Sequence, residues 1–411
     1  MNLLPHRCLG ILGIVILASN LSSAEELNGV VRRYQQALID QDQTGSNAVI
    51  LFRDGRRICE QSVQSGKQGD RDVNSRTVFP IWSMSKPVTI VATMLLHEQG
   101  KFDWDDEVSA YIPCLKNLRY MENGRIKNCK EPLRIIHLMT HQSGWSYPRL
   151  ENEIDVGAVP DVRFDSIYPN QTRFDNLQEF VEACARQPLA FEPGTRFLYG
   201  VNQAILGRLI EVVSGQSFEG FLQQEIFKPL GMIDTGFSLN AEQRARFQPL
   251  FINTGSLKGF TYLLDEMSYR PGSRACFGGE GLVSTMEDYA RFCEMLLAGG
   301  VFRGERILSE DSIATMTKKW VSGYPQEANA DAELAGHYFG FSLFILDVPE
   351  KKEKNVPRGI YGWAGYHNTH FWIDPENKMF GLFMSRARPF NWGIPFGLRE
   401  IVYEQFSAED E

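Results

Sequence analysis

Segments with strand character occur near both ends of this chain, and a mainly helical stretch separates them. Near the N-terminus, helical spacing of apolar residues over 25–40 precedes two extended segments, 48–52 and 57–63. The Asp54-Gly55 pair between these segments is a strong signal for a hairpin turn. Further extended segments follow near the C-terminus at 339–346, 370–374 and 379–385, before a closing helix over 398–406. This distribution predicts an α/β fold of the α+β type, with one antiparallel sheet built from both chain ends and flanked by helices.

The middle of the chain is predicted to form an inserted, mainly helical lobe. Apolar periodicity, capping residues and acidic first turns indicate helices over 133–140, 177–186, 202–214, 218–226 and 286–297. We expect one two-lobed module over 25–411. Its sheet lobe comprises about 25–105 and 300–411, and its helical lobe about 106–299.

The first 24 residues have the features of a secretory signal peptide. His6 and Arg7 give a polar start, residues 8–18 form an apolar run, and small residues at 22–24 place the cleavage site after Ala24. A membrane anchor is the alternative, but the run is about half the ~20 residues that cross a bilayer. The sequence therefore predicts a periplasmic or secreted protein with no stable membrane span after cleavage.

Charge and composition limit the partners of the chain. The formal net charge is −9, and no basic stripe is present to follow a phosphate backbone, so nucleic acid is excluded as an expected partner. With 43% hydrophobic residues, the chain can bury a large core. We expect a small-molecule ester or amide substrate, and the sequence leaves the oligomeric state open.

Cysteine usage adds an expectation about disulfides. Of the seven cysteines, Cys8 lies in the predicted signal peptide, and the even number that remains permits disulfides after export. Cys114 and Cys129 flank a polar segment that has the character of a hairpin, and we expect these two to be bridged. The other cysteines are expected to be buried thiols.

The strongest candidate for a nucleophile is Ser83, which belongs to the S-x-x-K pattern that ends at Lys86. Proline is tolerated only in the first turn of a helix, so Pro87 indicates a helix that begins at about Ser83. Amides and the dipole at a helix N-terminus favour developing negative charge. Residues three apart share a helix face, so Lys86 would lie beside the Ser83 hydroxyl, whereas Ser85 would point elsewhere. Partial desolvation of Lys86 would leave a neutral amine that can accept the serine proton.

The simpler interpretation is that Ser83 only caps a helix and Lys86 is solvated. Two observations favour the functional interpretation instead. This is the only S-x-x-K in the chain, and it coincides with the independently predicted helix start. The chain also has no G-x-S-x-G motif that would supply another nucleophile.

Four motifs together resemble the serine β-lactamase-related superfamily, and most closely its family VIII esterases. The superfamily also includes class C β-lactamases and D-Ala-D-Ala carboxypeptidases. The resemblance spans about residues 31–406. The matching segments are the S-x-x-K at 83–86, L-M-T-H-Q-S-G at 138–144, E-P-G-T-R-F-L-Y at 192–199 and G-G-E-G-L-V-S-T at 278–285.

The resemblance implies roles for particular residues. Tyr199 would be the partner base that relays the proton with Lys86, and because a phenol titrates near 10 in water it needs a cation nearby. The backbone N–H groups of Ser83 and Tyr366 would form the oxyanion hole. No metal or cofactor is expected: His137 and His141 have a zinc-like spacing, but a glutamate of the H-E-x-x-H type is missing.

Two departures from the superfamily pattern narrow the expected substrate. Asn202 follows Tyr199 one residue later than the class C asparagine would, and we expect it near the substrate. The Lys-Thr-Gly motif of relatives is replaced by Trp363-Ala364-Gly365, which together with His367 is expected to line the substrate site. Tryptophan cannot bind a substrate carboxylate as lysine does, so a neutral ester is favoured. His367, Arg386 or Arg388 could restore the charge.

The predicted function is an exported serine hydrolase that forms an acyl-enzyme, most closely a carboxylic ester hydrolase. A β-lactamase or D-Ala-D-Ala carboxypeptidase is the first alternative. A catalytically silent binding or sensor protein on the same fold is the second, because the second and third motifs are altered.

Overall fold

A seven-stranded sheet forms the centre of the molecule in the computed structural model, which describes residues 11–147, 173–255, 258–262, 269, 271–321 and 334–407 and gives side chains from residue 25 onward. Its strands follow the order β11-β12-β13-β14-β15-β1-β2, and every neighbouring pair is antiparallel. Their bounds are β1 (Asn47–Arg53), β2 (Arg56–Val63), β11 (His337–Phe339), β12 (Phe344–Leu346), β13 (Tyr361–Gly365), β14 (Thr369–Asp374) and β15 (Met379–Met384). The prediction of one sheet built from both chain ends is confirmed, because β1 pairs with β15.

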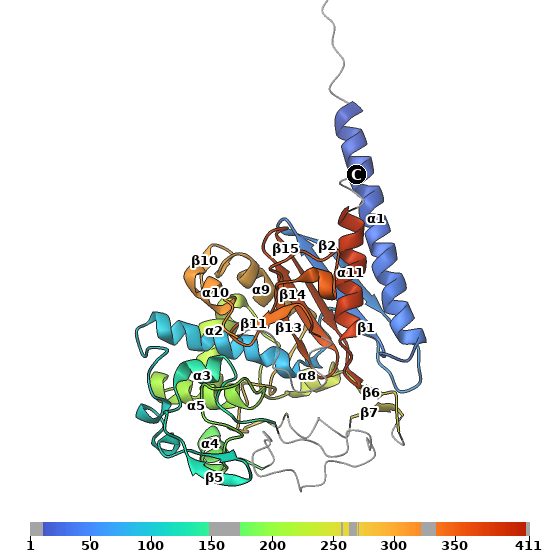
Figure 1. The fold of residues 1–411 in the computed structure, drawn as a ribbon. Coiled ribbons are helices and arrows are strands. Elements are labelled where there is room, and N and C mark those ends of the chain that lie inside the picture. The colour runs from blue at the N-terminus through green and yellow to red at the C-terminus, as the bar shows by residue number, and fades with distance from the viewer. Residues whose placement is uncertain are drawn as a thin grey trace, which may run out of the picture.

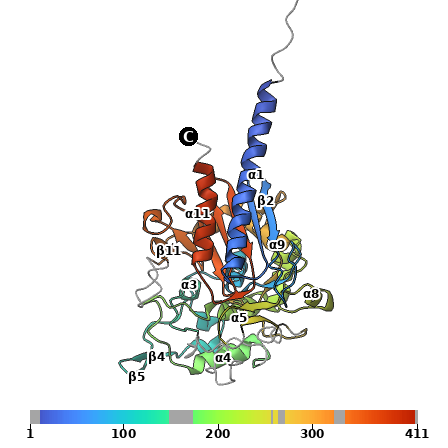
Figure 2. The ribbon, with the colours of Figure 1, turned by 90° about the vertical axis from the view of Figure 1, so that its right-hand side faces the viewer.

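Helices cover both faces of this sheet (Figures 1 and 2). Helices α1 (Ile11–Asp40) and α11 (Gly393–Ser407) pack together on one face, and α9 (Met286–Leu297) packs on the other. Neighbouring residues of β14 show the alternation that strand geometry requires. The ring of Phe371 packs against Tyr289 of α9, whereas the indole N–H of Trp372 donates to Tyr403 of α11.

The helical part of the molecule is built around α2 (Ser85–Glu98), whose residues from Ser85 to Leu96 are all buried. A helix that is buried on every side is apolar over most of its surface, and this explains the largely hydrophobic run after Pro87. Helix α2 packs against α5. The neighbouring helices are α3 (Ile135–Met139), α4 (Leu177–Arg186), α5 (Asn202–Ser214), α6 (Phe218–Leu222), α7 (Lys228–Leu230), α8 (Ala241–Ala245) and α10 (Glu310–Met316). The predicted bounds of α4, α5 and α9 are confirmed, and a π-helical turn follows α6 where the prediction had one longer helix.

Smaller strands complete the described part of the chain. Two short strands, β3 and β8, pair beside the start of α2, and the parallel pairing of β16 with β6 joins the C-terminal part of the chain to a segment before α9. The bounds are β3 (Phe79–Pro80), β4 (Arg119–Glu122), β5 (Arg125–Asn128), β6 (Leu250–Ile252), β7 (Gly259–Thr261), β8 (Val283–Ser284), β9 (Val301–Phe302), β10 (Glu305–Arg306) and β16 (Ala387–Arg388).

Two strand predictions near the C-terminus need correction. The apolar run 339–346 is not one strand, because the chain reverses between β11 and β12 at Ser342, whose φ is +52°. Strand β13 was not predicted, since its glycines weaken strand character in the sequence. Gly362 is needed there because a Cβ would lie 2.1 Å from the carbonyl oxygen of Phe371 on β14.

The predicted Cys114–Cys129 disulfide is wrong. In the described part of the chain both residues are free thiols, as are Cys59, Cys184, Cys276 and Cys293. The hairpin of β4 and β5 does form, but its ladder continues to Leu118, whose carbonyl accepts the N–H of Cys129 at 2.9 Å. Cys129 is therefore opposite Leu118, and Cys114 lies further back in a separate 3₁₀ turn.

The backbone of α1 passes without a break through the predicted cleavage site after Ala24 and extends away from the other elements (Figures 1 and 2). Among the helices that the structure describes, none has the length and apolarity needed to cross a membrane. The signal peptide therefore stays a prediction.

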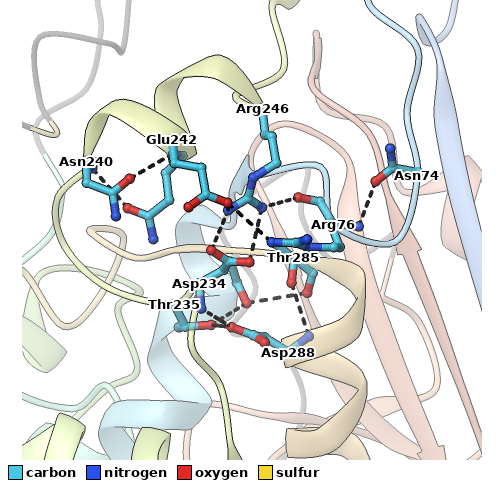
Figure 3. A network of polar contacts seen from close by, with 11 residues as sticks. Asn74, Arg76, Asp234, Thr235, Asn240, Glu242, Arg246, Thr285 and Asp288 are labelled. Carbon is cyan, nitrogen blue, oxygen red and sulfur yellow. Dashed lines mark hydrogen bonds and ion pairs between the residues drawn. The ribbon is translucent and has the colours of Figure 1, made fainter.

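A polar network fixes the N-terminus of α9 to the chain that leads into β3 (Figure 3). Arg246 binds both carboxylate oxygens of Asp234 at 2.6 and 3.1 Å, and the Arg246 carbonyl accepts the Val78 N–H at 3.0 Å. The Asp288 carboxylate accepts the Asp234 N–H at 2.7 Å, and the Asp288 N–H donates to the cap residue Thr285 at 3.2 Å. These bonds join three segments that are distant in the sequence.

This network gives the first prediction, a pH dependence of stability. Burial raises the pKa of the Asp288 carboxyl to about 6. Because this folded-state pKa exceeds the unfolded one, its contribution to stability is complete below about pH 4 and is lost as the pH rises through 6. We expect the wild type to lose about 2 to 3 kcal/mol relative to Asp288→Asn between pH 4 and pH 8, measured by urea unfolding.

The control is Thr285→Ala, which removes the cap and should cost about 1 kcal/mol at every pH. Parallel stability profiles for wild type and Asp288→Asn would contradict the prediction.

Candidate active site

Ser83 lies in a 3₁₀ turn, Trp82–Met84, that leads directly into α2. The predicted helix start is confirmed to within two residues, and Pro87 occupies the first turn of α2 as its missing N–H requires. The Ser85 hydroxyl accepts the N–H of Leu282 at 3.1 Å and is buried, so it points away from Ser83 as expected. Among these residues, the geometry leaves Ser83 as the candidate nucleophile.

Lys86 is fully buried and contacts three acceptors. Its Nζ lies 3.1 Å from Ser83 Oγ, 3.0 Å from the phenol oxygen of Tyr147 and 2.8 Å from the carbonyl oxygen of Gly279. These three contacts hold Nζ in place between α2, the Tyr147 loop and the Gly279 loop. The neutral amine expected from the sequence stays a prediction, because the hydroxyls of Ser83 and Tyr147 can donate as well as accept.

Tyr199 lies on the other side of Ser83. Its phenol oxygen and Ser83 Oγ share a hydrogen bond of 2.9 Å, and the indole N–H of Trp363 donates to the same phenol oxygen at 3.4 Å. The Lys86 Nζ lies 4.6 Å from the centroid of the Tyr199 ring. The structure thus brings together the three residues that were predicted to be catalytic.

His141 positions the segment that carries Tyr199. Its carbonyl accepts the Leu198 N–H at 2.7 Å, and its Nδ1 accepts the Gly200 N–H at 3.4 Å. Burial, and then the charge of Lys86, lower the pKa of His141 well below its ordinary value, so the ring is a neutral acceptor at Nδ1. A Cβ at Gly200 would lie 2.0 Å from the Trp145 carbonyl, so only glycine permits this path next to Tyr199.

Two residues that were predicted to contact substrate do not reach a surface. Asn202 is fully buried, and its amide lies 2.8 Å from His141 Nδ1, because the added residue in the motif places it on the first turn of α5. His367 is also fully buried; its Nδ1 accepts the indole N–H of Trp82 at 2.9 Å, and its Nε2 lies 2.9 Å from Arg388 Nε. The prediction that Asn202 and His367 contact substrate is therefore corrected: both are buried and support neighbouring residues.

The third motif lies on β13, beside the turn that holds Ser83. Gly365 allows this contact, since a Cβ there would lie 2.2 Å from the Ile81 carbonyl oxygen. Trp363 is 2% exposed and Ala364 5%, so the motif forms the buried side of Tyr199 and not an open aromatic wall. Tyr366 follows β13, and its ring lies 5.5 Å from that of Trp82.

Two residues at this site were missed in the sequence. Tyr147 contacts Lys86, and its hydroxyl donates to Glu280 Oε2 at 2.6 Å. Glu280 is the variable position of the G-G-E-G-L-V-S-T segment that carries the family resemblance, and this placement was the available signal. For Tyr147 the sequence offered none, because only the fold brings its loop to α2.

The described residues contain no group of three or more histidine, cysteine or acidic side chains that could hold a metal ion. His137 and His141 have separate roles, because His137 Nδ1 accepts the Arg134 N–H at 3.2 Å in the cap of α3.

Arg386 is buried and donates to the Gln248 carbonyl at 2.6 Å, whereas the Arg388 guanidinium lies 4.9 Å from the centroid of the Tyr366 ring.

The corrected position of Asn202 gives the second prediction. Asn202→Ala removes the amide that contacts His141 in a buried site and should lower the free energy of unfolding by about 1 to 3 kcal/mol. At a temperature where the variant is folded, KM for an ester substrate should stay within about twofold of wild type, because no substrate contact is lost. A KM increase of about tenfold with unchanged stability would restore Asn202 to the substrate site.

Comparison with known proteins identifies the family of this chain. The family model described as beta-lactamase matches residues 31–398. Protein Rv1367c of Mycobacterium tuberculosis is 26% identical, over 80% of this chain and 84% of its own, and esterase EstB of Burkholderia gladioli is 24% identical, over 90% and 93%. The solved structure of EstCE1, described as a hydrolase with promiscuous acyltransferase activity, shares the fold with a TM-score of 0.76 and 21% identity, covering 94% of this chain and 100% of that one. The matched family model spans most of the chain, which therefore belongs to the beta-lactamase family and is an enzyme of the serine hydrolase type.

Proposed function

We propose that this protein is a carboxylic ester hydrolase that works through an acyl-enzyme on Ser83. The observation that carries the proposal is the continuous set of contacts in which Ser83 Oγ lies 3.1 Å from Lys86 Nζ and 2.9 Å from the Tyr199 phenol oxygen. A serine hydroxyl is a weak nucleophile until an adjacent group accepts its proton, and both neighbours are within hydrogen-bond distance.

In the proposed reaction Tyr199 starts as a phenolate, and Ser83 Oγ attacks the ester carbonyl while the serine proton passes to the phenolate oxygen, which becomes a phenol. The Lys86 ammonium beside the Tyr199 ring and the N–H of Trp363 both stabilise the negative charge that the Tyr199 oxygen carries before this transfer. Tyr199 then returns the proton to the departing alkoxide. A water molecule then attacks the acyl-enzyme while Tyr199 accepts its proton, and Tyr199 passes that proton to Ser83 Oγ as the acid is released.

We assign the oxyanion hole to the backbone N–H groups of Ser83 and Tyr366. The first N–H group lies in the 3₁₀ turn that leads into α2, near the helix N-terminus, where free amides and the helix dipole favour negative charge. Gly365 supports the assignment of the Tyr366 N–H group. It keeps the end of β13 in close contact with the backbone at Ile81, two residues before Ser83.

The substrate is proposed to be a neutral ester. Trp363 occupies the place of a lysine that would bind a substrate carboxylate, and its indole contacts Tyr199 instead. The relatives EstB and EstCE1 are named as an esterase and as a hydrolase with acyltransferase activity. Arg388 beside the Tyr366 ring supports the competing class, anionic β-lactams or D-Ala-D-Ala peptides.

We also propose export, on the basis of the N-terminal sequence.

The third prediction concerns covalent chemistry at Ser83. A fluorophosphonate probe should label the wild type and should fail to label Ser83→Ala, as read by intact-protein mass. Lys86→Met and Tyr199→Phe should lower the labelling rate by roughly 10² to 10⁴, the usual contribution of acid–base groups. Ser85→Ala is the matched control and should label at about the wild-type rate, because Ser85 points away. A wild type that does not label would favour the silent binding protein.

The fourth prediction compares substrate classes. With purified protein, kcat/KM for p-nitrophenyl butyrate should exceed kcat/KM for a chromogenic cephalosporin by about tenfold or more, the value of one lost charge-assisted contact. Efficient cephalosporin turnover with negligible ester cleavage would assign the protein to the β-lactamase alternative.

A further inference from the structure

Lys86 is a buried cation, and the structure connects it to a buried carboxylate through one phenol. Nζ donates to the Tyr147 oxygen at 3.0 Å, and the Tyr147 hydroxyl donates to Glu280 Oε2 at 2.6 Å. Lys86 is fully buried, and Glu280 is only 8% exposed. A charge in such a site is strongly destabilising unless it is compensated, so the carboxylate and the ammonium depend on each other.

The three groups of this connection come from different parts of the fold. Lys86 belongs to α2, Tyr147 to the loop after α3, and Glu280 to the loop before β8. Gly279, next to Glu280, also accepts a hydrogen bond from Nζ at 2.8 Å, so one loop supplies both a carbonyl and a carboxylate to the lysine. A Cβ at Gly279 would lie 2.9 Å from the Tyr147 hydroxyl oxygen, so glycine leaves room for the phenol.

We propose that Glu280, acting through Tyr147, is a positioning residue that keeps Lys86 protonated and aimed at Ser83, and so assigns the base role to Tyr199. This inference rests on the proposed function, because it specifies the roles of two of its residues. The proton count follows directly. The serine proton moves to Tyr199 and then to the leaving alkoxide, while the three protons of Lys86 stay in place.

The ionisation of Glu280 should therefore be visible in the rate. Burial raises the pKa of this carboxyl, while the Lys86 charge and the Tyr147 hydrogen bond oppose that rise. The titratable groups that face Glu280 in the described structure are Lys86 from α2 and Tyr147 from its loop, and Tyr199 lies beyond Lys86. As the pH falls and Glu280 is protonated, its support of Lys86 is lost.

The fifth prediction uses Glu280→Gln, which keeps the size and an acceptor for Tyr147 but removes the charge. At pH 8, kcat/KM for p-nitrophenyl butyrate should fall roughly tenfold to a hundredfold, as expected for the loss of a charged hydrogen-bond partner, with KM little changed. Below the pKa of Glu280, the ratio of kcat/KM for wild type to kcat/KM for Glu280→Gln should fall toward one. A purely structural role would give a ratio of rates that does not vary with pH.

Two further variants make the test decisive. Tyr147→Phe should lower the rate to a similar extent, and the double variant should be no slower than either single variant, because both interrupt one connection. Glu294→Gln is the matched control: burial also raises the pKa of Glu294, but its charged neighbours are Arg57, Glu287, Arg291 and Arg303. The control should leave the rate and its pH profile unchanged.

The outcomes separate the two proposals. Thermal unfolding at pH 8 should show that Glu280→Gln is less stable than wild type, because the buried Lys86 loses its compensating carboxylate, and the rates are therefore compared at a temperature where both proteins are folded. A labelled, active wild type with a constant rate ratio, or with additive effects of the two substitutions, would overturn this inference alone. A wild type that neither labels at Ser83 nor cleaves the ester would overturn the proposed function and this inference together.

Discussion

The buried ammonium of Lys86 is the interaction on which the arrangement of this molecule depends. A fully buried cation must find an acceptor for each of its N–H groups, and here the acceptors come from three separate segments. The turn at Ser83, the loop at Tyr147 and the loop at Gly279 are therefore fixed to α2 by the same atom. A change in any of these segments would leave a buried charge partly unsatisfied, so the requirements of stability and of the site coincide.

The sheet supplies the opposite side of the site. Strand β1 from the N-terminal part pairs with β15 from the C-terminal part, and this pairing brings β13 beside the turn that holds Ser83. The contact is possible because Gly365 has no side chain to strike the Ile81 carbonyl. Trp363 on the same strand then reaches the Tyr199 phenol. The tryptophan at position 363 thus has two effects. It removes the cation that relatives have there, and it adds an N–H donor to the Tyr199 oxygen.

Local sequence signals explain which elements could be predicted. Asp54 and Gly55 both adopt positive φ in the predicted hairpin, and Thr285 caps α9 where the sequence indicated. These features depend on neighbours in the chain, so they are readable without the fold. The segments that the sequence predicted poorly are those whose structure depends on contacts with residues distant in the chain. Strand β13 is rich in glycine because it packs closely against other backbone, and its sequence therefore lacks the apolar alternation of a strand.

The sequence by itself determined the fold class and the pairing of Ser83 with Lys86, because helix periodicity and Pro87 fix residues three apart on one face. It also indicated Tyr199 through a motif. Only the tertiary structure decided the state and surroundings of these residues. It showed three acceptors around Lys86, moved Asn202 and His367 into buried supporting positions, and joined Glu280 to the site through Tyr147. The physical reason is that charge compensation and burial are set by side chains from distant segments, and sequence spacing carries no information about those contacts.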